Sequence, residues 1–210
     1  MKWARFMACA LTVLPGLIAA GNVVAADAVS GEADRVVTVA NFDRDLLGRE
    51  IFRASNEARI KHDAAPLKPE PRLVAAADEQ AAMLAIRIHG GHDNPLPNQG
   101  DPLARVVQAG LHPGMVAENA ATLSARNRNA GRDYTYRELA AAIVQAWMDS
   151  PGHRANLLSP QFQYLGCSAR AAFLPPDDPR VYAIQVFYTP APGSEPPIPT
   201  MKPGDIRITH

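Results

Sequence analysis

The stretch Trp147-Met-Asp-Ser-Pro-Gly-His153-Arg154-Ala-Asn-Leu-Leu158 holds the most informative local pattern in the chain. Apolar residues at helical spacing lead into its tryptophan, and Thr135 and Glu138 stand before them at the spacing of a capping box. We therefore predict a helix over 136–148, then a tight turn at the Ser-Pro-Gly step. A further short helical segment is expected from about Ser159.

The predicted turn gives His153 two interpretations. A turn can hold a histidine at a surface edge, where loops often carry function. The simpler alternative is a helix stop and restart with a solvated histidine, and the turn taken by itself slightly favours this alternative.

The rest of the chain alternates helix-like and strand-like patterns. Apolar residues at helical spacing predict two amphipathic helices, and an Asp-Pro start with a Gly stop predicts a short third helix. One short run and two longer β-prone runs predict strands, the last two joined by a Pro-rich turn over 174–179. The predicted helices are 43–62, 73–88 and 101–109, and the predicted strands are 115–121, 164–173 and 180–188. This mixture predicts an α+β fold.

Both ends of the chain differ in composition from the middle. Residues 1–28 have a positive start, an apolar run and small residues, the order of a secretory signal peptide. A membrane anchor is the weaker alternative, because the run is shorter than the roughly 20 residues a bilayer requires and contains Pro15. Residues 29–40 are expected to form a leader, 41–190 one domain, and 191–210 a Pro-rich extended tail.

Charge and cysteine content exclude several classes of protein. Lys plus Arg number 21 and Asp plus Glu number 21, so no net field favours nucleic acid or an anionic membrane. Cys9 lies within the predicted signal peptide, which leaves Cys167 alone and rules out an internal disulfide in the mature chain. Its apolar, alternating surroundings predict a small buried residue rather than a reactive thiol.

Candidate chemistry centres on a carboxylate and a few histidines. Glu118-Asn119 interrupts a short apolar strand, and a buried carboxylate is costly without partners. Glu118 therefore either faces water or meets donors such as a histidine. His89 and His92 have a spacing that could serve a metal, but zinc commonly needs three or four protein ligands and no HExxH pattern is present.

Together these residues resemble bacterial members of the CAP superfamily, the group of cysteine-rich secretory proteins, antigen 5 and plant pathogenesis-related proteins. The resemblance rests on the Glu118-Asn119 pair, the Trp147-to-Leu158 stretch and the following Leu165-Gly166-Cys167. The match extends upstream and covers roughly residues 45–190; its upstream parts are Asn56-Glu57-x-Arg59, Leu73 through Met83, His92, and Arg105 to Gly110. The family implies an α-β-α sandwich, in which helices cover both faces of a small antiparallel sheet.

The resemblance also implies a cleft with two histidines and acidic residues that can bind a divalent metal, often zinc. By this match His92 and His153 are the candidate metal ligands, and Glu118, Asn119 and Ser150 line the cleft. His92 is preferred to His89 because its distance from the second predicted helix fits the family. Many eukaryotic relatives carry a glutamate where this chain has Ser150. Asp149 is one step away on the helix and points elsewhere, so structural histidines bonded to Glu118 are an equal alternative to a metal site.

Three functions follow as hypotheses. The leading one is a secreted or periplasmic bacterial binding protein, non-enzymatic, whose cleft holds a small ligand or a metal and whose surface meets a cell-envelope or host component. The rival is a metal-assisted hydrolase of peptides or esters, with His92 and His153 as ligands and Glu118 as general base. A lipid or sterol carrier is third, and no residue supports it. Nucleic-acid binding and a membrane span after processing are not expected.

Overall fold

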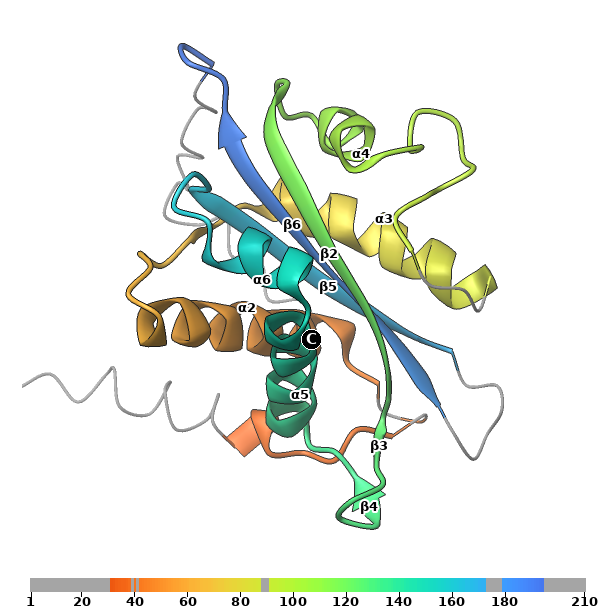
Figure 1. Cartoon of the computed structure of the whole chain (residues 1–210). Coiled ribbons are helices and arrows are strands. Elements are labelled where there is room, and N and C mark those ends of the chain that lie inside the picture. Colours follow the sequence, from red (N-terminus) through yellow and green to blue (C-terminus); the bar gives the residue numbers. More distant parts are fainter. Residues whose placement is uncertain (1–30, 39, 41, 88–90, 173–178, 195–210) are drawn as a thin grey trace, which may run out of the picture.

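A computed structural model describes residues 31–38, 40, 42–87, 91–172 and 179–194. A central sheet lies between two helical layers (Figure 1). Helices α2, α5 and α6 cover one face, and α3 and α4 cover the other. The helices are α2 (Arg44–Lys61), α3 (Pro71–Arg87), α4 (Pro102–Gln108), α5 (Tyr136–Asp149) and α6 (Pro151–Leu158). The strands are β1 (Lys68–Pro69), β2 (Gly114–Ser124), β3 (Arg126–Asn127), β4 (Arg132–Asp133), β5 (Tyr164–Ala172) and β6 (Arg180–Pro190).

The main sheet has the strand order β1-β5-β6-β2. Strand β6 pairs antiparallel with β2 over all of its length and with β5 on its other side, and so forms the centre of the sheet. Strand β1 adds two residues in parallel to the start of β5. The sheet therefore presents β2 at one edge, and β2 carries the Glu118-Asn119 pair.

Two apolar clusters fill the spaces between the layers, because neighbouring residues of a strand point to opposite faces. On one face, Trp147 of α5 and Leu46 of α2 pack over Phe187 of β6. On the other face, Leu73 of α3 packs over Ile184 of β6. All five side chains are fully buried, and burying such an apolar side chain stabilises the fold by about 1.5–3 kcal/mol. Burial on both faces fixes the register of the strands and so the position of the β2 edge.

Glycine at one position lets a helix approach the sheet closely. A Cβ atom at Gly166 of β5 would lie 2.3 Å from the Leu73 carbonyl carbon and 2.4 Å from the Val74 nitrogen. Both are backbone atoms of α3, so no side-chain rotation can relieve the clash. Helix α3 can lie directly on β5 only because residue 166 has no side chain.

The α+β sandwich predicted from the sequence is confirmed, and so are the predicted cap at Asp101 and the predicted capping box at Thr135 and Glu138. Asp43 and Asp101 cap α2 and α4 through their side chains. Thr135 and Glu138 form the reciprocal capping box of α5. Strand β2 is longer than predicted because its last three residues, 122–124, pair with residues 180–182 of β6.

The turn and later helix predicted after α5 are wrong. Helix α6 begins at Pro151, directly after α5. Ser159 is the C-cap of α6 and not the start of a later helix. Proline suits the first position of a helix because its missing N–H would have no partner there, so the chain restarts at once. His153 consequently lies in the first turn of a helix and not in a loop.

The segment expected as a leader is in contact with the domain. Val37 is 3% exposed, and Val36 forms a β-bridge with Thr135. The predicted signal peptide, His89, residues 174–178 of the predicted turn and residues 195–210 of the tail lie outside the described residues. Within the described ranges, none of the helices is long and apolar enough to span a membrane.

Candidate functional site

The candidate site is built around Glu118 on the edge strand β2. Its side chain is 1% exposed, and both carboxylate oxygens are engaged. Arg105 Nη2 donates to Oε2 at 2.6 Å, and His92 Nδ1 lies 3.0 Å from Oε1. Of the two alternatives that the sequence left open for Glu118, the structure has the second: the carboxylate meets donors.

Arg105 of α4 holds this side of the site together. Its side chain is fully buried, and Nη1 donates to the Gln99 carbonyl at 2.7 Å and to the His92 carbonyl at 3.3 Å. One guanidinium thus fixes both Glu118 and the backbone of His92. An arginine in a short helix has the same local pattern whether it faces water or the protein interior, so this role of Arg105 could not be predicted from the sequence.

Asn119 points to the other face of the sheet and holds α6. Its Nδ2 donates to the His153 carbonyl at 3.0 Å and to Gln185 Oε1 at 3.1 Å. Asn156 returns a hydrogen bond to Asn119 Oδ1 at 3.0 Å. Adjacent residues of one edge strand therefore fix the two histidines from opposite faces: Glu118 holds the side chain of His92, and Asn119 holds the backbone of His153.

The imidazoles of His92 and His153 lie next to one another, with ring centroids 6.3 Å apart and planes tilted by 60°. The hydrogen bond that His92 Nδ1 donates to the Glu118 carboxylate raises the pKa of His92, against an opposing effect of burial. Burial lowers the pKa of His153, and the positive charge of His92 lowers it further. Proton uptake therefore falls on His92 before His153.

The donor set fits two ligands of a metal ion. A carboxylate that accepts from one ring nitrogen of a histidine fixes the tautomer and leaves the other nitrogen for a metal, as in many zinc sites. Two rings bound through nitrogen to one tetrahedral zinc have centroids about 5 Å apart, since each Zn–N bond is about 2.0–2.1 Å. The two rings, at 6.3 Å, would therefore move about 1 Å closer to share one ion. Among the described residues, no group of three or more His, Cys, Asp or Glu side chains is arranged to hold a metal.

Neither Ser150 nor Asp149 supplies an acidic side chain to the site of His92 and His153. Ser150 stands between α5 and α6, and its hydroxyl makes no capping hydrogen bond to α6. Asp149 accepts from Gln145 Nε2 at 2.8 Å and lines a pocket between α2 and α5 that contains neither histidine. This agrees with the helical rotation by which the sequence placed Asp149 away from the position of Ser150.

Comparisons with known proteins agree with this architecture. The family model for "CAP: Cysteine-rich secretory protein family" matches residues 52–171. The chain therefore belongs to the cysteine-rich secretory protein (CAP) family, as its resemblance predicted. Among curated relatives, it is 22% identical over 145 residues to the uncharacterized protein YkwD of Bacillus subtilis (strain 168), which covers 69% of this chain and 51% of YkwD.

The fold is similar to a solved structure as well. The crystal structure of an extracellular protein containing a SCP domain from Bacillus anthracis str. Ames matches with a TM-score of 0.51 and 22% identity. The match covers 69% of this chain and 41% of that one. This chain therefore spans about half or less of each relative, and the likeness concerns the fold of the shared domain.

Proposed function

We propose that this chain is an exported, non-enzymatic CAP-domain binding protein in which His92 and His153 bind a divalent metal such as zinc. The observation that carries the proposal is the pairing of the two imidazoles at 6.3 Å, with His92 bonded through Nδ1 to a buried carboxylate. The metal would take its remaining ligands from water or from a small bound molecule, and would supply a positive centre for an anionic or carbonyl group.

The environment of Glu118 supports binding rather than hydrolysis. A general base must reach the water that it deprotonates. Both oxygens of Glu118 are occupied by Arg105 and His92, and the side chain is almost fully buried. This carboxylate is therefore placed to orient His92 and to stabilise its positive charge. Glu118, the general base named in the hydrolase hypothesis, is therefore poorly placed for that role.

Export is supported by residues 1–28, which have the charge and length of a signal peptide. The Bacillus anthracis relative is described as an extracellular protein. A cell-envelope or host component is then the partner class with access to the site.

Zinc titration by calorimetry tests the metal part on the chain without residues 1–28. The wild type should bind one zinc per chain, and a His92→Ala, His153→Ala double variant should not. His112→Ala removes an exposed histidine outside the site and serves as the matched control. Glu118→Gln should weaken zinc binding about 10- to 100-fold, because it removes the partner that orients His92.

The pH dependence provides a second measurement. Because the pKa of His92 is raised, a proton competes with the metal, so zinc should bind more tightly as the pH rises toward this pKa, and its affinity should level off above it. Proton release on binding makes the measured enthalpy depend on the buffer. Identical heats for the wild type and the double variant would refute the metal proposal.

A further inference from the structure

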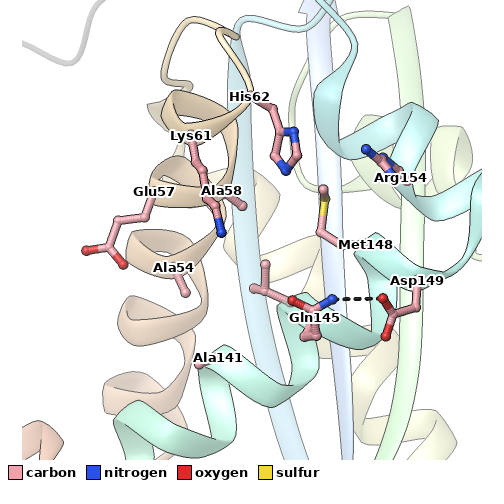
Figure 2. A pocket seen from close by; sticks show the side chains of 11 residues that line it. Ala54, Glu57, Ala58, Lys61, His62, Ala141, Gln145, Met148, Asp149 and Arg154 are labelled. Carbon is pink, nitrogen blue, oxygen red and sulfur yellow. Dashed lines mark hydrogen bonds between the residues drawn. The ribbon is translucent and has the colours of Figure 1, made fainter.

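A pocket of about 360 Å³ lies between α2 and α5, outside the histidine site (Figure 2). It exists because small residues face one another across the two helices. Ala54 and Ala58 are one turn apart on α2, and Ala141 lies on α5. Val144 and Met148 of α5 complete an apolar lining. The volume is at the lower end of the range for small-molecule sites, about 300–1,000 Å³.

Three basic side chains line this pocket: Lys61 and His62 from the end of α2, and Arg154 from α6. Figure 2 shows His62 and Arg154 pointing toward one another, with Met148 between them. None of the three side chains has a hydrogen-bond or ion-pair partner in the part of the chain that the structure describes. Cations favour the C-terminal end of a helix, which accounts for Lys61 and His62 but not for Arg154, near the start of α6.

The acidic residues at the pocket are already engaged by other groups. Glu57 pairs with Arg53 one turn earlier on α2. Asp149 accepts a hydrogen bond from Gln145, which the dashed line in Figure 2 marks. The charge of Glu57 is balanced by Arg53, whereas the neutral amide of Gln145 leaves the charge of Asp149 uncompensated. Lys61 and Arg154 therefore outnumber Asp149 by one, and the pocket keeps one excess positive charge.

We propose that this pocket is a second ligand site, which binds a phosphate monoester with a short apolar body. Arginine and lysine are the side chains that recognise phosphate in proteins, the first through a planar fork and the second as a point charge. Three basic groups around one pocket match the three terminal oxygens of a monoester better than the two of a carboxylate. The alanine walls and Met148 would cover an alkyl group.

Butyl phosphate is the probe that tests the proposal, with NMR observation of the His62 ring and the Met148 methyl. The chain without residues 1–28 is titrated at low salt. A metal chelator is present, so that a metal at the histidine site cannot bind the phosphate. Saturable shifts of both signals are expected. Inorganic phosphate and butyrate should each bind at least about 5-fold more weakly, because one lacks the apolar body and the other lacks an oxygen and charge.

Four variants test the role of charge in the pocket: two should weaken binding, one should tighten it, and one is a control. Lys61→Gln and Arg154→Gln should each weaken butyl phosphate binding about 3- to 10-fold. Asp149→Asn should tighten it about 2- to 5-fold, because it removes a repelling charge and keeps an oxygen for Gln145. The matched control is Arg49→Gln, an exposed cation outside this pocket, which should change nothing.

The size of the pocket is tested separately. Ala58→Leu should fill it and remove the preference for butyl phosphate over inorganic phosphate. Absence of saturable shifts in the wild type, equal weakening by Arg49→Gln, or butyrate binding as tightly as butyl phosphate would each overturn the proposal.

Discussion

Replacing Arg105 by methionine removes the partner of a buried carboxylate. Glu118 is 1% exposed and would keep only His92 as a charged partner, while the Gln99 carbonyl would lose its 2.7 Å donor. Breaking a buried ion pair by removing one member typically costs about 3–5 kcal/mol. For a domain of this size, each kcal/mol lowers the melting temperature by about 2–4 °C, so we expect a loss of about 6–20 °C.

Urea unfolding followed by the fluorescence of the buried Trp147 measures this change in the free energy of unfolding. The informative comparison is the Arg105→Met, Glu118→Leu double variant, which leaves no unpaired charge behind. It should be at least about 1 kcal/mol more stable than Arg105→Met alone, because the penalty arises from the isolated carboxylate. A single variant that costs less than about 1 kcal/mol, or a double variant less stable than the single, would refute this reasoning.

Three other perturbations test separate parts of the structure. The raised pKa of His92 means that its protonated form stabilises the fold below its unfolded pKa, and that this stability is lost as the pH rises through the folded pKa. The stability difference between the wild type and His92→Gln should therefore be larger at pH 5.5 than at pH 8.5, and a difference that grew with pH would contradict the assignment. Gly166→Ala should destabilise by about 3 kcal/mol through its clash with α3, measured by urea unfolding, whereas Gly152→Ala in α6 meets nothing within 4 Å and should not destabilise. Burial raises the pKa of the Cys167 thiol, so a thiol reagent should label it only in urea, and fast labelling of the folded protein would show that the site opens.

The elements that the sequence predicted correctly depend on local chemistry. Asp101 and Thr135 cap helices whose first amide groups lie within three residues of them, so local spacing alone identified these two helix starts. The wrong prediction of a turn before a helix at Ser159 concerned a Ser-Pro step. Such a step is compatible with either a turn or an immediate helix start.

The contacts of the candidate site join residues that are far apart in the sequence, so no local pattern predicts them. Glu118 meets Arg105 across 13 residues and His92 across 26, and Asn119 meets the backbone of His153 across 34. The sequence marked Glu118 as a carboxylate that needed partners. Arg105 was included in the family match, but nothing in the sequence assigned it as the partner of Glu118. Only the family resemblance selected His92 and His153 as a pair.

The sequence by itself determined the class of fold, the caps of the helices and the family, because these follow from periodicity, spacing and short ordered motifs. The tertiary structure alone decided which groups surround Glu118 and that Asp149 lines a pocket separate from the histidines. It also decided that Lys61 and Arg154, 93 residues apart by number, line the same pocket. The physical reason is that strand register and helix packing set these neighbours, and both arise from the burial of two apolar faces of one sheet.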